Sequence, residues 1–320
     1  MSGEHSPAVS GDIARADSGD HARTRSGDAA TALPARALLD RVTVVTVTHE
    51  SAGALGGFLA ALPPGLAVLV VDNASTDAGP AMAEAAGARM IRSARNLGFG
   101  AACNLGLAAA GTEFVLLANP DSRLSAEAVA ALVAAADTFA EAAILAPAIH
   151  DAAGRPVRSW DAEQFRRRHL PRRRDAEAWP EGPLSVEHAS GACLLLRPAD
   201  GLRFDEGFFL YYEDDDLCAE ARRRGRGIVV VPAAVVTHAG GASTAPSPAI
   251  VARKAWHMAR SRLRYAAKHA GAAAARREAL ARLAHHAAKA LGHALTLRGQ
   301  KLRADAAALS GTLAWMRGAR

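Results

Sequence analysis

Short apolar runs rich in β-branched residues alternate with helix-forming stretches in the part of the chain that begins near residue 41. The runs are continuously rich in β-branched and apolar residues, as expected of strands that are covered on both faces. The expected strands cover residues 42–47, 67–71, about 90–91 and 114–118. The expected helices between them cover residues 52–62, 78–88 and 99–110. Connections this short form right-handed βαβ units, so the pattern predicts an α/β fold whose mostly parallel sheet is flanked by helices.

The two ends of the chain differ from this region in composition. The first 40 of the 320 residues repeat Ser-Gly-Glu or Ser-Gly-Asp every eight residues and offer almost nothing to bury, which predicts a disordered leader over residues 1–40. Residues 251–320 hold 15 Lys and Arg against Glu278 and Asp305, whereas the remainder is acidic, since the formal net charge of the chain is only +6. We therefore expect a folded domain over residues 41–250 and a basic helical tail over residues 251–320.

The cysteines and the hydropathy of the chain bear on where the protein works. Three cysteines lie far apart without a CxxC pair, as is usual for reduced thiols of cytosolic proteins. No apolar run reaches the roughly 18 residues that a membrane span requires, and the N-terminus lacks the apolar core of a signal peptide. We expect a cytoplasmic protein whose basic tail meets an anionic partner, with nucleic acid and an anionic membrane surface as the two candidates.

Polar residues follow three of the expected strands at the point where each strand ends. They are Thr48, Glu50, Asp72, Asn73, Asn119 and Asp121. Ligands of open α/β sheets bind beyond the carboxyl ends of the strands, so this pattern predicts a ligand site of the kind that holds a nucleotide. Ser75, Thr76 and Asp77 fit the same site, but they fit equally well as caps of the next helix.

A glycine-rich segment over residues 95–108 tests the dinucleotide-binding alternative. It contains Gly98 and Gly100 but carries Cys103 where a dinucleotide fingerprint requires a third glycine, and it does not follow the first strand. These departures disfavour a Rossmann dehydrogenase. Asn96 and Asn104 flank the glycines and offer amide donors and acceptors to a ligand, although a glycine-rich turn with an Asn cap would have the same sequence.

Carboxylates and one histidine in later segments suit catalysis. Asp121 follows Asn-Pro and offers a hard oxygen ligand to Mg²⁺ or Mn²⁺. His238 follows an apolar strand and precedes two glycines, which makes it a ligand candidate, although a lone histidine is more often structural. The run from Glu213 to Asp216 begins an expected helix, where negative charge is favourable. Four adjacent carboxylates exceed that need, and their repulsion tends to raise the pKa of one of them, which suits a general base.

Six segments in order resemble one known family. The segments VVTVTHES, VVDNASTD, RNLGFGAACNLGLAAAGTEFVLLANPDS, ASGACLLLRP, FDEGFFLYYEDDDLCAEARRRG and HAGGAS resemble the family-two glycosyltransferases with the GT-A fold, in particular the bacterial rhamnosyltransferases of cell wall polysaccharide biosynthesis. The resemblance covers roughly residues 41–270. It implies a GT-A fold with a helical extension, and inverting transfer of a sugar from a nucleotide-diphosphate donor with the help of a divalent cation.

The resemblance also implies a role for individual residues. The implied nucleotide-binding residues are Thr48, Glu50, Asp72, Asn73, Asn96, Asn104 and Asn119. Asp121 and His238 would hold Mg²⁺ or Mn²⁺, and Asp214 would be the catalytic base. The acceptor side would contain Ser190, Gly191 and Glu213. Two positions depart from the family pattern, since His49 stands where a tyrosine is usual and Asn119 replaces the first carboxylate of the Asp-x-Asp motif.

The sequence also suggests the two substrates. Asp72 at a strand end can accept a hydrogen bond from the ring N–H of uracil or thymine, which predicts a UDP- or dTDP-linked sugar. Asn119 cannot serve as the carboxylate acceptor of a ribose 2′-hydroxyl, which favours the thymidine form. Eight arginines over residues 155–175 suggest a mobile loop near the mouth of the site and an acceptor that carries phosphate, such as a polyprenyl-diphosphate sugar. A loop that is merely solvated is the alternative.

The basic tail allows two interpretations, and the sequence also bears on three alternative functions. Arg253, Arg260, Arg264 and Lys268 recur at helical spacing beside an apolar stripe, which is typical of a helix on an anionic membrane surface, while Arg260 or Arg262 could instead reach the diphosphate. A sugar-nucleotidyltransferase would need a Gly-rich signature followed by Lys after the first strand, and a purely binding relative would not need intact catalytic carboxylates. A nucleic-acid-binding protein is disfavoured because the chain has no helix-turn-helix, zinc finger or aromatic stacking motif.

Overall fold

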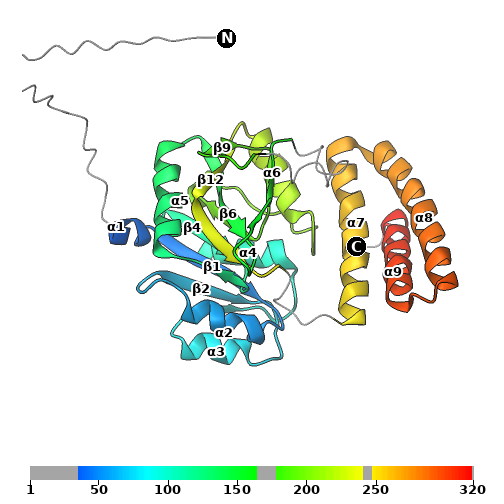
Figure 1. Ribbon diagram of the computed structural model, residues 1–320, viewed down its shortest axis with the longest axis horizontal. Coiled ribbons are helices and arrows are strands. Elements are labelled where there is room, and N and C mark those ends of the chain that lie inside the picture. Colours follow the sequence, from blue (N-terminus) through cyan, green and yellow to red (C-terminus); the bar gives the residue numbers. More distant parts are fainter. Residues whose placement is uncertain (1–34, 164–177, 241–246, 319–320) are drawn as a thin grey trace, which may run out of the picture. The chain divides into compact units, whose positions relative to one another are not determined.

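The computed structural model of the chain describes residues 35–163, 178–240 and 247–318 (Figure 1). Nearly all of the expected leader and the arginine-rich segment from residue 164 onward lie outside the described residues. The described end of the leader, Ala35–Leu39, forms helix α1, and Leu39 is buried in the core of the sheet domain.

The strands and helices that the sequence predicts between residues 42 and 118 are all confirmed. They are β1 (Val42–Thr48), α2 (Ala52–Ala60), β2 (Ala67–Asp72), α3 (Gly79–Ala85), β3 (Arg89–Arg92), α4 (Phe99–Ala109) and β4 (Phe114–Ala118). The remaining strands are β5 (Ser122–Arg123), β6 (Ala142–His150), β7 (Pro156–Val157), β8 (Trp160–Asp161), β9 (Leu184–Ser185), β10 (His188–Ala189), β11 (Cys193–Leu196) and β12 (Gly227–His238). Two further helices of this sheet domain are α5 (Ala126–Thr138) and α6 (Glu213–Arg223).

The main sheet has the strand order β3-β2-β1-β4-β11-β6-β12-β5. The strands β1 to β4 pair in parallel, β11 runs antiparallel to its neighbours, and β12 is parallel to β6. Because Thr48 pairs with Asp72, the ends of β1 and β2 lie side by side. β12 pairs with β5 in the antiparallel sense, which brings His238 opposite Ser122. Polar residues from distant parts of the sequence therefore meet at one edge of a mixed, mostly parallel sheet.

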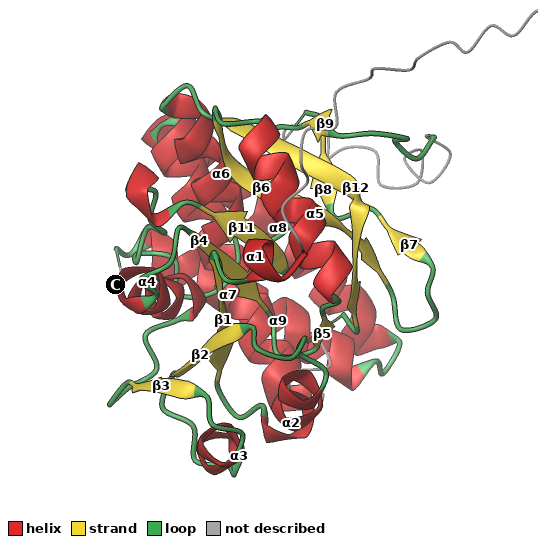
Figure 2. Cartoon of the chain, turned by 90° about the vertical axis from the view of Figure 1, so that its left-hand side faces the viewer, coloured by secondary structure: helices red, strands yellow, loops and turns green. Residues whose placement is uncertain are grey.

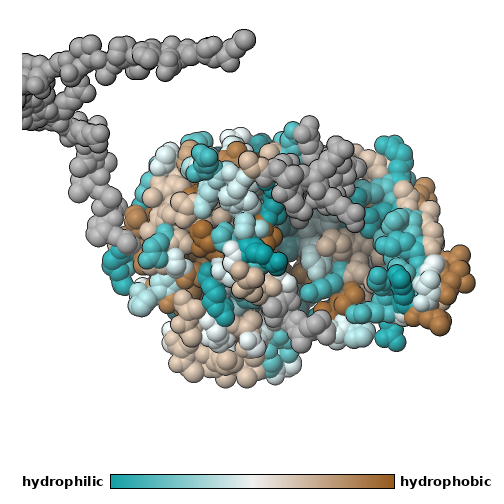
Figure 3. Space-filling model, viewed as in Figure 1, coloured by the Kyte–Doolittle hydropathy of each residue, from teal (hydrophilic) through white to brown (hydrophobic). Residues whose placement is uncertain are grey.

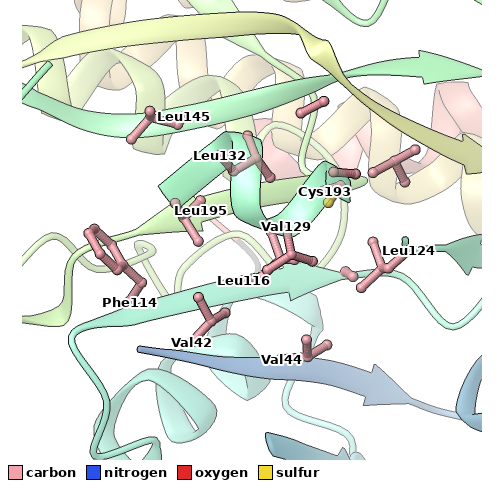
Figure 4. Close-up of a cluster of buried hydrophobic side chains, with 14 of the residues drawn as sticks. Val42, Val44, Phe114, Leu116, Leu124, Val129, Leu132, Leu145, Cys193 and Leu195 are labelled. Carbon is pink, nitrogen blue, oxygen red and sulfur yellow. The ribbon is translucent and has the colours of Figure 1, made fainter. Parts of the chain in front are cut away.

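Buried side chains fill both faces of this sheet. On one face, Val44 and Leu116 lie with Val129 of α5 (Figure 4), and α1 packs beside α5 on the same side (Figure 2). On the other face, Val45 belongs to a second cluster that includes Leu107 of α4. Since the neighbours Val44 and Val45 enter opposite clusters, both faces of the strand are covered, which explains why the strand does not alternate between apolar and charged residues.

Three helices follow the sheet domain, namely α7 (Pro248–Ala270), α8 (Ala272–Leu295) and α9 (Gly299–Met316). α7 begins where the Ser247 side chain accepts a hydrogen bond from the N–H of Ile250, and it contacts both α8 and α9. Among the described residues, no helix has the combined length and apolarity that crossing a membrane requires. The helical extension implied by the sequence is therefore present.

The basic stripe expected along α7 packs against the sheet domain instead of facing outward. Arg264 and Lys268 both pair with Asp205, at 3.1 and 2.8 Å. The ring of His257 stacks on Phe209 with the centroids 4.7 Å apart. These contacts bury part of the stripe and pair two of its cations, Arg264 and Lys268, with a carboxylate, so α7 packs against the sheet domain in this structure.

Candidate active site

A cleft of about 640 Å³ opens at the carboxyl edge of the parallel strands. Its lining comes from the loops after β1, β2, β3 and β4, residues 190–192, the loop over residues 209–212 with the start of α6, the end of β12, and the first half of α7. Figure 3 shows this hollow between the sheet domain and the C-terminal helices. The sheet edge thus forms one wall of the cleft, and a helix from the tail forms another.

An amide network ties the loops after β2 and β3 together. Asn73 donates from Nδ2 to Asn96 Oδ1 at 3.0 Å and to the Gly98 carbonyl at 3.1 Å, while its own Oδ1 accepts from the N–H of Leu97 at 2.8 Å. Gly98 has a φ of 91°, and a Cβ there would collide with the carbonyl of Phe209. Only glycine therefore allows this close approach. Asn73 and Asn96 line the cleft, so the network fixes its floor.

Thr48, which the family resemblance assigned to the nucleotide, does not line the cleft. Its side chain is fully buried, whereas the neighbouring Val47 and His49 both line the cavity. His49 Nδ1 lies 3.1 Å from the carbonyl oxygen of Asn73. The structure therefore turns His49, the residue that departs from the family pattern, toward the ligand space in place of Thr48.

Glu50 and Asp72 brace the same loops. Glu50 Oε1 accepts from the N–H and the hydroxyl of Thr76 at 2.8 and 3.0 Å, and Asp72 Oδ1 accepts from the N–H of Ser75 at 3.0 Å. Asp72 is 5% exposed. In these contacts both carboxylates hold the β2–α3 loop against the end of β1.

Asp77 resolves the open question about helix caps. Its Oδ1 accepts from the N–H of Gly79, at the start of α3, and its Oδ2 accepts from the N–H of Ala52, at the start of α2, at 3.0 and 2.8 Å. One carboxylate thus caps two helix N-termini, where negative charge is stabilising.

Asn104 lies in α4 and ties that helix to a loop a hundred residues away. Its Nδ2 donates to the carbonyl of Phe204 at 3.0 Å, and its Oδ1 accepts from the N–H of the same residue at 2.9 Å. Asn104 is not among the residues that line the cleft. Its amide therefore serves loop placement in this structure, and the structure does not bring it to the other predicted nucleotide residues.

Asp121 and His238 meet as the sequence predicts. Asp121 Oδ1 lies 3.2 Å from His238 Nε2, and Asn119 Nδ2 lies 3.2 Å from the same nitrogen. Mg²⁺ binds its ligands at about 2.1 Å in octahedral geometry, so neighbouring ligand atoms on one ion lie about 3 Å apart. The pair matches that spacing, and the carboxylate of Asp121 is the kind of oxygen ligand that suits Mg²⁺ or Mn²⁺. Diphosphate oxygens and water would supply the remaining ligands.

The carboxylates of the EDDD run occupy the first turn of α6 and point in different directions. Asp214 is half-buried and lines the cleft, beside Ser190 and Gly191. Its Oδ2 accepts from the N–H of Gly191 and its Oδ1 from the N–H of Asp215, each at 3.0 Å. Two backbone donors therefore fix the orientation of the one carboxylate of this turn that is most accessible.

Glu213 and Asp216 are both buried, with different surroundings. Glu213 is 6% exposed, and burial together with the charge of Asp214 raises its pKa well above the usual value. Asp216 accepts hydrogen bonds from Lys268 Nζ at 2.9 Å and from His269 Nε2 at 2.8 Å. Asp216 thus joins α6 to the end of α7, and Glu213 is a carboxyl group at the edge of the cleft whose ionisation is opposed by burial.

The backbone is strained around the cleft. Tyr211 and Tyr212 directly precede the acidic run, and both have φ near 67°. Glu50 and Ala74 also have positive φ, at 53° and 64°. Such conformations cost of order 1–3 kcal/mol for each residue and collect at functional sites. With this backbone conformation both tyrosines line the cleft, and α6 begins beside the cleft with Asp214 in its first turn.

His188 is a residue near the acidic run that the sequence interpretation missed. It is 1% exposed, and its Nε2 lies 3.9 Å from both Asp214 Oδ2 and Asp215 Oδ1, while its Nδ1 lies 3.9 Å from Asp161 Oδ2. Among the described residues, His188, Asp214 and Asp215 form a group whose ligand atoms lie within 4.8 Å and could hold a metal ion. A single histidine between Glu and Ala gave no signal in the sequence.

Two cations of α7 also line the cleft. They are Arg253 and Lys254, and within the part of the chain that the structure describes no carboxylate pairs with either of them. Arg262, which the sequence suggested for the diphosphate, pairs instead with Glu278, and Arg260 lies over the ring of Trp256. The cationic part of the cleft therefore lies one to three helical turns nearer the start of α7 than expected.

Known proteins resemble this chain in sequence and in fold. The model of the Glycosyl transferase family 2 matches residues 43–199. The N-acetylglucosaminyl-diphospho-decaprenol L-rhamnosyltransferase of Mycobacterium tuberculosis is 30% identical over 251 residues, which is 66% of this chain and 80% of that protein. An uncharacterized glycosyltransferase of Mycobacterium bovis is 37% identical over 102 residues, which is 32% of this chain and 46% of that protein.

A solved structure shares the fold. A mannosyltransferase from Pyrobaculum calidifontis, in complex with GDP-Man and Mn²⁺, superposes with a TM-score of 0.52 at 17% sequence identity, with 88% of each chain covered. At this identity the likeness concerns the fold alone. It agrees with the GT-A architecture that the sheet order and the flanking helices describe.

Proposed function

The chain belongs to glycosyl transferase family 2, and we propose that it moves a rhamnosyl group from a pyrimidine nucleotide-diphosphate donor to a polyprenyl-diphosphate-linked sugar, with inversion. The observation that carries the proposal is that His238, which contacts Asp121, and the Asp214 carboxylate line one cleft. The similarity to a decaprenol-linked L-rhamnosyltransferase supports both the sugar and the lipid-linked acceptor, and with them a role in cell wall polysaccharide biosynthesis. The family assignment decides against a sugar-nucleotidyltransferase and against a nucleic-acid-binding protein.

Asp121 and His238 are the proposed ligands of Mg²⁺ or Mn²⁺. The spacing of their ligand atoms fits one ion, and both come from strand ends that the sheet holds rigidly. A divalent cation bound there neutralises negative charge on the departing diphosphate. We prefer this pair to the group around His188, because hydrogen bonds from two backbone N–H groups already engage the carboxylate of Asp214.

Asp214 is the proposed general base. It would accept the proton of the acceptor hydroxyl while that oxygen attacks the anomeric carbon and the bond from that carbon to the diphosphate oxygen breaks on the opposite face. A single displacement of this kind inverts the anomeric centre. The N–H groups of Gly191 and Asp215 hold the carboxylate ready, and Ser190 and Gly191 lie on the same wall, which supports their acceptor-side assignment.

Arg253 and Lys254 are proposed contacts of a diphosphate. Both cations line the cleft, and diphosphate oxygens form charge-assisted hydrogen bonds with both residue types. Asn73, Asn96 and Asn119, which also line the cleft, remain the proposed nucleotide contacts. For Glu50, Asp72 and Asn104 the contacts described above support loop bracing, with Asp72 still the candidate partner of a pyrimidine ring.

The direct test offers the purified protein dTDP-rhamnose, a UDP-linked sugar or GDP-mannose with Mn²⁺ and a polyprenyl-diphosphate N-acetylglucosamine. We expect mass spectrometry to find a disaccharide lipid with dTDP-rhamnose, and NMR to show the inverted anomer. In calorimetry, dTDP should bind more tightly than UDP, and both more tightly than GDP. Tight binding of GDP without binding of either pyrimidine diphosphate would overturn the donor assignment.

A further inference from the structure

The outward side of α8 carries an apolar stripe that nothing else in the described structure covers. The four most exposed large apolar side chains among the described residues are Leu280, Leu291, Leu295 and Leu297, which are 59%, 64%, 77% and 91% exposed. At 100° per residue, the three that lie in α8 fall within an arc of about 60°. Exposed alanines at 284, 287, 288 and 294 continue the same stripe. We call these eight residues the outer face.

The opposite side of α8 already holds the helix in place. Ala275 and Ala279 are fully buried, and His286 and His293 bond through Nδ1 to the carboxylate of Asp305 in α9, at 2.8 and 2.7 Å. The packing of the three C-terminal helices therefore does not require the outer face. A single exposed leucine is ordinary on a protein surface, but a continuous apolar stripe marks an interaction surface.

Cations surround the outer face and carboxylates do not. No Asp or Glu occurs between residues 279 and 304 of the sequence. The exposed basic residues of this region are Arg276, Arg277, Lys289, Arg298, Lys301 and Arg303. Leucines bordered by lysine and arginine are typical of helices that lie in the interface of an anionic membrane. A second copy of this chain would bring like charges together, which argues against pairing through this face.

We propose that the outer face of α8, with the α8–α9 turn, rests on an anionic membrane surface. The leucines would enter the layer between headgroups and acyl chains, and the cations would meet headgroup phosphates. In Figure 3 the apolar side chains gather over the lower end of α8, at the right of the view, away from the cleft. The proposed membrane contact does not depend on the proposed sugar transfer, because it involves neither the donor nor the acceptor.

The position of α7 connects the proposed membrane contact with the cleft. α7 contacts both α8 and α9, and its first half lines the cleft. A tail that rests on lipid would therefore hold the cleft one helix away from the membrane. This arrangement suits a protein that works at the inner face of the membrane without spanning it.

The test is flotation of the full chain with vesicles of phosphatidylglycerol and phosphatidylcholine, compared with vesicles of phosphatidylcholine alone. We expect binding to the anionic vesicles that weakens as salt is added. The variant Leu291→Gln/Leu295→Gln/Leu297→Gln should reduce the partition coefficient by tenfold or more. The variant Arg298→Gln/Lys301→Gln should reduce it by a smaller factor and flatten the salt dependence.

A matched control replaces exposed apolar residues elsewhere, Met82→Gln/Val157→Gln, and should bind vesicles as the unaltered chain does. Circular dichroism establishes that each variant is folded. The proposal is overturned if the triple leucine variant floats with anionic vesicles as well as the unaltered chain. It is also overturned if light scattering finds a dimer that the leucine variant dissociates while no form of the chain binds lipid.

Discussion

The two sides of the cleft use their polar residues differently. On the bracing side, formed by the loops after β1 and β2, the side chains of Glu50, Asp72 and Asn73 form hydrogen bonds with other protein groups. On the reactive side, formed by β4, β12, α6 and α7, Asp214, His238, Arg253 and Lys254 line the cavity, and the buried Asp121 contacts His238. Polar residues at strand ends are therefore not equivalent. The first set mainly fixes the loops, although Asn73 also lines the cleft, whereas the second set is available to the substrates.

The largest effect that this comparison predicts comes from Asp121→Ala on the reactive side. Without that carboxylate His238 cannot hold a divalent cation alone, so turnover should fall by about 10³-fold or more, as when a major electrostatic contact to the transition state is lost. Calorimetry should find that Mn²⁺ no longer strengthens dTDP binding. Full activity of the unaltered enzyme after treatment with EDTA would contradict the metal assignment.

The next effect is expected for Asp214→Asn, which keeps the shape of the side chain and removes its basicity. The catalytic rate should fall by roughly 10²–10⁴-fold, the range for loss of a general base, while donor affinity stays near normal. Asp215→Asn serves as the matched control one residue away and should cost far less. The assignment fails if Asp214→Asn keeps its rate while Asp216→Asn loses it.

A smaller loss is expected when the cations of α7 are removed. Arg253→Ala/Lys254→Ala should weaken binding of a nucleoside diphosphate by roughly tenfold to a hundredfold, since each charge-assisted hydrogen bond contributes about 1.5–3 kcal/mol before losses to solvent. Arg276→Ala/Arg277→Ala removes the same charge from α8, outside the cleft, and should leave nucleotide affinity unchanged. If the two double variants bind the nucleotide with equal affinity, α7 is not part of the binding site.

On the bracing side, the comparison predicts a loss of stability with little loss of rate. Glu50→Ala removes the acceptor of the exposed N–H of Thr76, which water can then satisfy, so the free energy of unfolding should fall by about 0.5–1.5 kcal/mol. Urea denaturation measures the change. If the variant instead keeps its stability and loses nucleotide affinity, Glu50 contacts the ligand and the division between the two sides is wrong at this residue.

The smallest expected effect is a pH-dependent gain from Glu213→Gln. The pKa of Glu213 is raised in the folded state, so its contribution to stability is present below the unfolded value of about 4.3 and is lost as pH rises toward the folded value. Glutamine does not titrate, so the variant should gain stability relative to the unaltered chain as pH rises above the unfolded value, by about 1.4 kcal/mol for each unit of the shift. A difference that does not change with pH would contradict a buried, protonated Glu213.

Local sequence patterns were sufficient for the fold and for part of the site. The β-branched runs and the breaks between them predicted every element from β1 to β4. Strands of a parallel sheet that are buried on both faces require runs of apolar and β-branched residues, so their sequences are easily recognised. Asp121, His238 and Asp214 were assigned from their motifs and their order, and the structure brings Asp121 and His238 into contact.

The remaining features depend on contacts that no local pattern records. Thr48 and His49 are adjacent, and only the direction of the last strand residue decides which of them faces the cleft. Asn104 meets its partner a hundred residues later, and Arg253 reaches the cleft only because α7 packs against the sheet domain. Such choices follow from tertiary packing, which the sequence around each residue does not report.

Residues of α7 form ion pairs and hydrogen bonds with Asp205 and Asp216, and these contacts determine where the chain can be truncated without damage to the catalytic unit. Asp216 is 2% exposed, and its partners Lys268 and His269 both belong to α7. A fragment that ends near residue 250 would lose both partners of this carboxylate, two residues from the proposed base, and would expose to water the part of the sheet domain that α7 covers. The smallest self-sufficient catalytic fragment should therefore extend at least through Ala270, so that the first tail helix is part of the catalytic unit.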